Sequence, residues 1–82
     1  MDRAYSLVLR GSQRKKVVKA LDRPKIPTQI KEDTKLSLNN VSDVLRLLEK
    51  NEIVKCSNPE EKTGRIYKLT EKGMKIREEL IK

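Results

Sequence analysis

The chain has 82 residues and a mass of 9.5 kDa, which allows one small domain and excludes two independent cores, a TIM barrel and a doubly wound nucleotide-binding domain. Leu, Ile and Val account for 22 of the 82 residues while Phe and Trp are absent, so we expect residues 1–82 to form a single folded domain with an aliphatic core. The net charge of +8 and the pI of about 9.8 favour a polyanionic partner, although the same charges can also form a solvated surface.

The first amphipathic segment is predicted to form a helix from Ser12 to Leu21. Its apolar side chains gather on one side and its basic side chains lie elsewhere. Ser12 is suited to cap its start, because a serine hydroxyl accepts hydrogen bonds from the free amides of a first helical turn. The preceding residues 5–9 are mostly apolar, and both a short strand and an extra helical turn remain open for them.

A second, short helix is predicted from Pro27 to about Thr34, and a third from about Leu38 to Lys50. Pro27 suits a first helical turn, where the N–H that proline lacks has no helical partner. The third segment has the clearest pattern, since its apolar residues recur at i, i+3, i+4 and i+7. Ser37 can cap its start, and Asn51 can end it in the left-handed conformation. Its expected core side chains are Val41, Val44, Leu45, Leu47 and Leu48.

The last part of the chain changes period. Residues 53–56 and 65–69 are short β-type runs around a polar, turn-rich loop, which predicts a β-hairpin with a long tip. Thr70 is expected to cap a final helix to about Ile81, whose apolar positions are Met74, Ile76, Leu80 and Ile81. Cys56 is expected to be a small buried apolar residue of the hairpin rather than a redox sensor.

The predicted order is therefore three helices, a hairpin and a final helix. The second and third helices are separated by only a few residues, which is the spacing of a helix-turn-helix, and a hairpin directly after them is a wing. The predicted fold class is α+β, a winged helix-turn-helix with a three-helix core, a β-hairpin wing and a C-terminal helix.

Residues 45–56 and 58–73 resemble archaeal winged helix-turn-helix transcriptional regulators and, more broadly, MarR-like and ArsR-like repressor domains. The resemblance covers about residues 11–80, and Leu-Thr-Glu-Lys-Gly at 69–73 is its most specific part. It implies a double-stranded DNA partner, and it implies a homodimer that binds two half-sites. Residues 5–9 and the end of the final helix are the candidate dimer contacts, although these residues can also simply close the small core.

The chain departs from this family at two turns. Lys31 and Lys35 stand where the family usually has a small residue and a turn glycine, so we expect either a remodelled turn or a longer second helix. The family also often has glycine near Asn51 and Glu52, where asparagine tolerates the left-handed conformation.

The resemblance makes the third helix the recognition helix, which enters the major groove with its N-terminal part. Asparagine can pair with adenine, arginine with guanine, and serine with a base edge or a phosphate, whereas Asp43 can accept from cytosine but repels phosphates. These side chains can equally be the solvated face of an amphipathic helix. The candidate DNA-reading residues are Ser37, Asn39, Asn40, Ser42, Asp43 and Arg46.

The basic excess lies outside the predicted recognition helix. Residues 1–36 carry a net charge of +6, residues 37–56 are neutral, and residues 57–82 carry +2. We expect the excess to contact phosphates, although it can also be solvated. Arg65 has a second option, an exposed ion pair with Glu60 or Glu61 of the wing. The candidate backbone and wing contacts are Arg14, Lys15, Lys31, Lys35, Lys62 and Arg65, and Lys16, Lys19, Arg23 and Lys25 add to the same charge.

Several kinds of chemistry are not expected. The chain has no histidine and a single cysteine, so an intramolecular disulfide and a cysteine-based zinc site are excluded. Without a glycine-rich phosphate loop or a set of catalytic groups, we predict neither an enzyme nor a cofactor. No membrane span or signal peptide is recognisable, which predicts a cytoplasmic protein without a membrane partner.

Two other functions remain open. A neutral third helix is also compatible with a winged-helix module that binds a protein. Non-specific nucleic-acid or RNA binding through the basic residues is the other alternative, although single-strand recognition usually needs aromatic side chains and this chain has only two tyrosines. The operator, the sense of regulation and any small-molecule effector are unknown.

Overall fold

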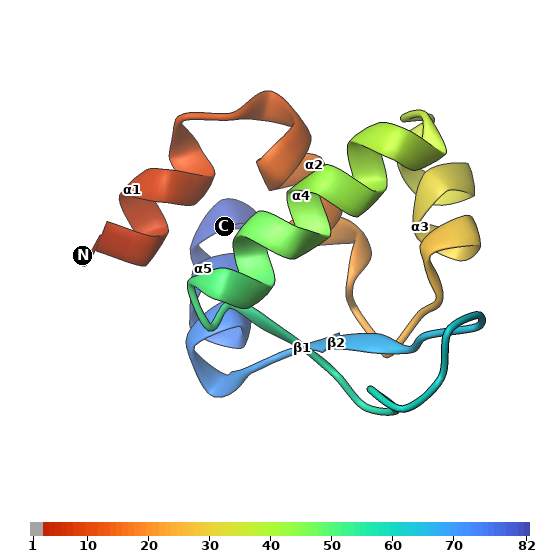
Figure 1. The fold of residues 1–82 in the computed structure, drawn as a ribbon. Coiled ribbons are helices and arrows are strands. Elements are labelled where there is room, and N and C mark those ends of the chain that lie inside the picture. The colour runs from red at the N-terminus through yellow and green to blue at the C-terminus, as the bar shows by residue number, and fades with distance from the viewer. Residues whose placement is uncertain (1–2) are drawn as a thin grey trace.

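The computed structural model describes residues 3–82, which form five helices and a two-stranded antiparallel sheet. This is an α+β arrangement with the predicted helix-turn-helix and wing (Figure 1). In Figure 1 the start of α4, the whole of α3 and the loop between the strands lie toward one side, and α1 lies toward the other. In chain order the elements are α1 Arg3–Leu9, α2 Ser12–Ala20, α3 Pro27–Thr34, α4 Leu38–Lys50, β1 Val54–Cys56, β2 Tyr67–Leu69 and α5 Glu71–Leu80.

The residues before α2 form a helix of their own, α1, so the two options left open for residues 5–9 resolve in favour of helix. Ala4 and Val8 are its buried side chains. The expected Ser12 cap was wrong. Gly11 occupies the N-cap position in extended backbone (φ −129°, ψ 122°), and Ser12 is already the first helical residue. The chain reverses between two helices here, and the carbonyl of Gly11 accepts the Lys15 N–H at 3.1 Å.

The aliphatic core draws on every helix and both strands. α4 contributes four buried side chains on one face, as its spacing predicted. Three expected core positions lie outside it: Leu47 is half-buried, and Met74 and Ile81 are 54% and 53% exposed. The fully buried large side chains are Val8, Val17, Val18, Ile30, Val41, Leu45, Leu48, Ile53, Val54 and Ile76.

The two strands are shorter than predicted, and a residue outside them extends the sheet. Val54 pairs with Leu69 and Cys56 with Tyr67. Beyond this pair, the Lys25 N–H donates to the Tyr67 carbonyl at 3.0 Å, and the Tyr67 N–H donates to the Lys25 carbonyl at 2.8 Å. The segment before α3 is thereby attached to the wing. A single bridged residue has no sequence periodicity, so the pattern did not predict it.

The exposed end of α4 also differs from expectation. Asn51 keeps a right-handed backbone (φ −99°), because its side-chain amide donates to the Leu47 carbonyl at 2.9 Å and its N–H to the same oxygen at 3.2 Å. Glu52 takes the left-handed conformation instead, with φ 60°. Cys56 was expected to be buried but is half-buried against the core, with its thiol 3.5 Å from the side-chain oxygen of Asn58.

Thr70 caps α5, as predicted. Its hydroxyl oxygen accepts the Gly73 N–H at 3.1 Å, and its hydroxyl hydrogen is donated to the Glu52 carbonyl at 2.6 Å. Gly73 is buried, and a side chain there would collide with the backbone oxygen of Ile53 and approach Leu69. The close approach of helix and loop therefore explains why glycine stands at this position of the Leu-Thr-Glu-Lys-Gly segment.

Candidate nucleic-acid interface

The turn between α3 and α4 sets the direction of the predicted recognition helix. α3 ends at Thr34, and Lys35 takes the left-handed conformation with φ 64°. Thr34 is buried, and its hydroxyl donates to the Ile30 carbonyl at 2.7 Å and accepts the Leu36 N–H at 3.3 Å. The turn is therefore neither remodelled nor absorbed into a longer helix. Lys35 adopts the conformation a turn glycine would take, at a cost of about 1–2 kcal/mol.

The first turn of α4 projects into solvent. Ser37 has extended backbone, and its hydroxyl accepts the Asn40 N–H at 3.1 Å, which confirms the predicted cap. All four residues 37–40 are exposed. In the described part of the chain, no hydrogen bond from the side-chain amides of Asn39 and Asn40 is found. These two amides are therefore available to an external partner.

Further along α4 the candidate residues face different surroundings. Asp43 and Arg46 are exposed and form an ion pair at 3.5 Å. Ser42 is half-buried and, with Arg46, lines a cavity of about 190 Å³ between α4 and the wing. Arg65 lines the same cavity from the wing side. The fold thus brings Arg46 and Arg65, which are 19 residues apart in the sequence, to one place.

The wing loop is organised by its own side chains. The Arg65 guanidinium donates to the carbonyls of Glu61 at 2.8 Å and Pro59 at 3.2 Å. The alternative prediction, an ion pair between Arg65 and the carboxylate of a wing glutamate, was wrong, because the guanidinium binds backbone carbonyls instead. Asn58 accepts the Ile66 N–H at 2.7 Å and donates to the Gly64 carbonyl at 3.2 Å. Lys62 remains exposed at the tip.

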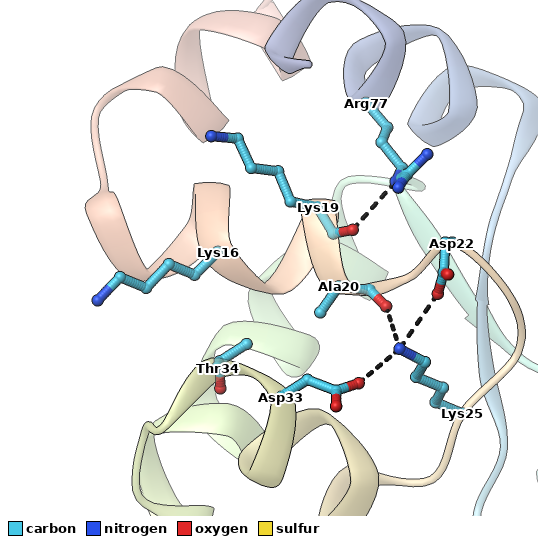
Figure 2. A pocket seen from close by; sticks show the side chains of 8 residues that line it. All are labelled: Lys16, Lys19, Ala20, Asp22, Lys25, Asp33, Thr34 and Arg77. Atoms are coloured by element: carbon cyan, nitrogen blue, oxygen red, sulfur yellow. Dashed lines mark hydrogen bonds and ion pairs between the residues drawn. The ribbon is translucent and has the colours of Figure 1, made fainter.

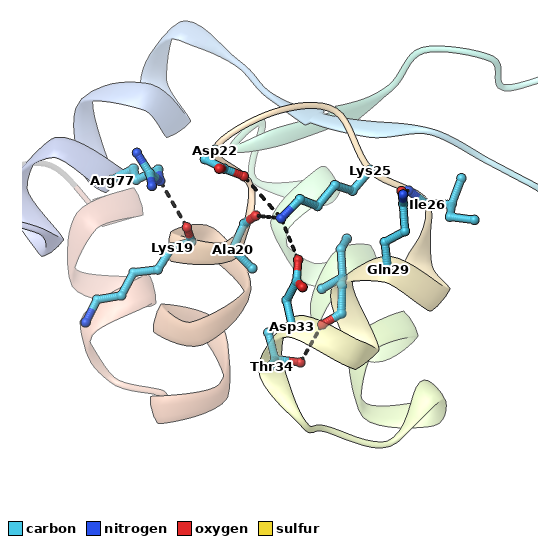
Figure 3. A network of polar contacts seen from close by, with 10 residues as sticks. Lys19, Ala20, Asp22, Lys25, Ile26, Gln29, Asp33, Thr34 and Arg77 are labelled. Carbon is cyan, nitrogen blue, oxygen red and sulfur yellow. Dashed lines mark hydrogen bonds and ion pairs between the residues drawn. The ribbon is translucent and has the colours of Figure 1, made fainter.

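Lys25 was predicted to add to the charge that contacts phosphates, but it does not lie on the basic surface. Its residue is only 7% exposed, and its ammonium lies among three acceptors (Figure 3). Nζ donates to the Ala20 carbonyl at 2.6 Å and to Asp33 Oδ2 at 2.5 Å, and it lies 3.1 Å from Asp22 Oδ1. We call this group the Lys25 network. The network connects the end of α2 to α3. The positive charge of Lys25 is neutralised inside the protein by the two carboxylates.

Within the Lys25 network the pKa values of Lys25 and Asp22 are shifted in opposite directions. The hydrogen bond to Asp33 and the contacts with Asp22 raise the pKa of Lys25 above 10.5, against the opposing effect of burial. The hydrogen bond from Lys25 lowers the pKa of Asp22 below 3.8. Both shifts favour the charged forms that hold the network together. The spacing of Asp22 and Lys25 is visible in the sequence, but the contribution of Asp33 is not.

The remaining basic residues of α2 fall into two groups. Arg14 and Lys15 are half-buried near the start of α2, and Arg14 Nη1 donates to the Leu7 carbonyl at 2.8 Å. Lys16 and Lys19 line a cavity of about 520 Å³, together with Arg77 from α5 (Figure 2). In Figure 2 the ammonium groups of Lys16 and Lys19 point away from the Lys25 ammonium.

Two further exposed lysines belong to α3 and to the turn that precedes α4. Lys31 and Lys35 are both exposed, and no ion pair is found for either within residues 3–82. Their charges are therefore free to act on an external anion. Sequence charge alone could not distinguish them from Lys25.

Within residues 3–82 no group of three or more His, Cys, Asp or Glu side chains could hold a metal ion. No helix in this range is long and apolar enough to cross a membrane.

Comparison with known proteins agrees with this architecture. The winged helix-turn-helix family model matches residues 15–82. A solved structure, the crystal structure of the diamide-treated YodB from B. subtilis, is 32% identical in sequence and has a TM-score of 0.78; the match covers 95% of this chain and 79% of that chain. No curated protein matches significantly. With most of its length matched in sequence and structure, the chain belongs to the winged helix-turn-helix family.

Proposed function

We propose that this protein is a DNA-binding transcription regulator that inserts the start of α4 into the major groove. The observation that carries the proposal is the first turn of α4, residues 37–40, which is exposed and presents two unengaged amides. The preceding turn and α3 carry the exposed charges of Lys35 and Lys31, which have no ion pair within residues 3–82. Amides can pair with base edges and lysines with phosphates, so the helix-turn-helix offers both kinds of contact.

The proposal assigns base reading to one set of residues and backbone contact to another. Arg46 can pair with guanine and the two asparagines with adenine, while Ser37 has committed its acceptor to capping and keeps a hydroxyl hydrogen to donate. Asp43 partners Arg46 and can accept from cytosine. The proposed base-reading residues are Ser37, Asn39, Asn40, Ser42, Asp43 and Arg46, and the proposed phosphate contacts are Arg14, Lys15, Lys31, Lys35, Lys62 and Arg65.

We also propose that the protein binds DNA as a homodimer, in the cytoplasm. Leu9 at the end of α1 and Ile81 just after α5 are 42% and 53% exposed, and half-buried Tyr5, Leu7 and Leu80 lie on the same two helices. A second copy that covers these side chains would remove apolar surface from water. Two copies would also double the phosphate contacts and present two recognition helices.

The experiment is a selection from random duplexes followed by anisotropy titrations at several salt concentrations. We expect one enriched motif, palindromic if the dimer forms, and a log K that falls by about 0.9 per phosphate for each unit of log salt. Arg46→Ala should then weaken binding to the enriched site by about 1–3 kcal/mol and relax specificity at one position.

Lys75→Ala, which removes an exposed charge from α5, serves as the control and should leave the motif unchanged. Absence of binding at low salt would refute the proposal and make a protein partner the leading alternative. An unaltered motif with Arg46→Ala would refute the role of Arg46 alone.

A further inference from the structure

Leu38, the first residue of α4, has an apolar side chain that does not contribute to the core of the fold. It is 47% exposed, whereas Val41, Leu45 and Leu48 of the same helix are buried. It does not pack in the core cluster, to which the neighbouring Leu36 does contribute. Single exposed leucines are common on protein surfaces, so its position rather than its exposure is informative.

The four large apolar side chains that are exposed within residues 3–82 differ in their surroundings. Leu9 and Ile81 lie near the ends of the chain, and Met74 lies on α5. Leu38 alone lies on the helix proposed to enter DNA. Its neighbours along the chain are Ser37 and Asn39, both exposed and polar.

The neighbours of Leu38 indicate what it would meet. An asparagine amide makes its two-bond contact with adenine, and the partner of adenine is thymine. The 5-methyl group of thymine is the apolar feature that a base pair offers in the major groove, and apolar side chains contact it. An unengaged amide and an exposed leucine at adjacent positions of one helical turn therefore match the two halves of A·T pairs.

We infer that Leu38 is a specificity-determining residue that contacts the 5-methyl group of thymine in the major groove. The inference rests on the DNA binding proposed above and extends it to a residue outside the polar set. It implies that the site read by the first turn of α4 is rich in A·T pairs, in contrast to the guanine expected opposite Arg46.

The test removes the methyl group from the DNA and the side chain from the protein in turn. In the enriched duplex, thymines are replaced one at a time by deoxyuridine, which keeps every hydrogen bond and loses only the methyl group. For the unaltered protein we expect one thymine whose replacement weakens binding by about fourfold, which corresponds to the free energy of burying one CH₂ group. Leu38→Ala should bind thymine and deoxyuridine equally at that position, while keeping its far-ultraviolet circular dichroism.

Two variants control for general effects. Leu38→Met keeps an apolar side chain of similar reach and should retain most of the preference for thymine. Met74→Ala removes an exposed apolar side chain from α5 and should retain all of it.

The outcomes separate this inference from the proposed function. A Leu38→Ala protein that keeps the wild-type preference for thymine, or a wild-type protein that has none at any position, overturns the role of Leu38 while DNA binding stands. A selection that enriches no duplex overturns both, and it does so before any thymine is replaced.

Discussion

Lys25 lies just before α3 and Lys35 directly after it, so one short helix separates two lysines with opposite surroundings. Lys25 is buried, has three oxygen partners and is bridged by its backbone to the wing. Lys35 is exposed, has no ion pair in the described part of the chain and holds a left-handed backbone. The comparison shows that the net charge of a segment does not measure the charge it offers to a partner. One end of α3 uses its lysine for cohesion, and the other leaves it free.

The largest expected effect comes from Lys25→Met, which keeps the apolar stem and removes the ammonium. The Ala20 carbonyl and the two carboxylates lose their shared donor, and we expect the free energy of unfolding to fall by about 1–3 kcal/mol. Urea denaturation measures this. The salt dependence of DNA binding should be unchanged, because the Lys25 charge is neutralised inside the protein. A reduced salt slope with unchanged stability would show that Lys25 contacts phosphate instead.

The pH dependence of stability should show the Lys25 network from both sides, with an effect smaller than that of the substitution. The pKa of Asp22 is lowered in the folded state, so its contribution is present above its unfolded value near 3.8 and is lost as the pH falls through the lower folded value. The pKa of Lys25 is raised, so its contribution is present below 10.5 and is lost as the pH rises through the higher folded value.

Urea midpoints measured from pH 2 to 12 should therefore change least with pH in the middle of the range and fall at both ends. The Lys25→Met protein is the control, and it should lose the part of the decline that Lys25 causes at both extremes. Identical profiles for the two proteins would mean that the network does not contribute to the pH dependence.

Lys35→Gly should separate the conformation of Lys35 from its charge. Glycine takes the left-handed backbone without strain, so we expect a gain of about 0.5–1 kcal/mol after its larger entropy loss on folding. Loss of the charge should reduce the salt slope of DNA binding by about 0.9. Glu52→Gly is the matched control, since Glu52 also has a positive φ of 60°. It should give the same stabilisation without the reduced slope.

The smallest effect on stability is expected for Lys31→Ala, at the exposed face of α3. Unfolding should change by less than about 0.5 kcal/mol, because no buried contact is lost. DNA affinity should weaken evenly across sequences, with a salt slope reduced by about 0.9 if one phosphate contact is removed. Anisotropy titrations on the enriched duplex and on a scrambled one measure both. A loss confined to the enriched duplex would instead make Lys31 a base-reading residue.

The architecture was accessible from the sequence because its signals are local. The apolar spacing and the Ser37 cap predicted α4 with the bounds that the structure shows, and Thr70 predicted the start of α5 in the same way. Both caps depend on a hydroxyl and an amide three residues apart, which adjacent sequence is enough to specify. α1 was left undecided because seven residues, several of them apolar, are too few to distinguish a helix from a strand.

The misses arise from hydrogen bonds of polar side chains whose partners the apolar spacing does not reveal. Lys25 was counted as a surface charge because Asp33 and the Ala20 carbonyl reach it only after folding. The left-handed residue after α4 was assigned to Asn51, the better residue for it, but the Asn51 amide is held by Leu47. Of the candidate interface, the exposed polar residues of α4 followed from its amphipathic pattern. Leu38 belongs neither to the expected core side chains nor to the candidate DNA-reading residues, because only polar and charged side chains were considered for base contacts.

The paired hydrogen bonds between the backbones of Lys25 and Tyr67 have a consequence for how the molecule opens. They make the entry to α3 and the second strand of the wing part of one cooperative unit, because neither amide can reach solvent unless the same bridge separates. The amide hydrogens of these two residues should therefore exchange with deuterium at matched rates. A partner that immobilises the wing would slow exchange at the start of α3 as well, even where it touches nothing there.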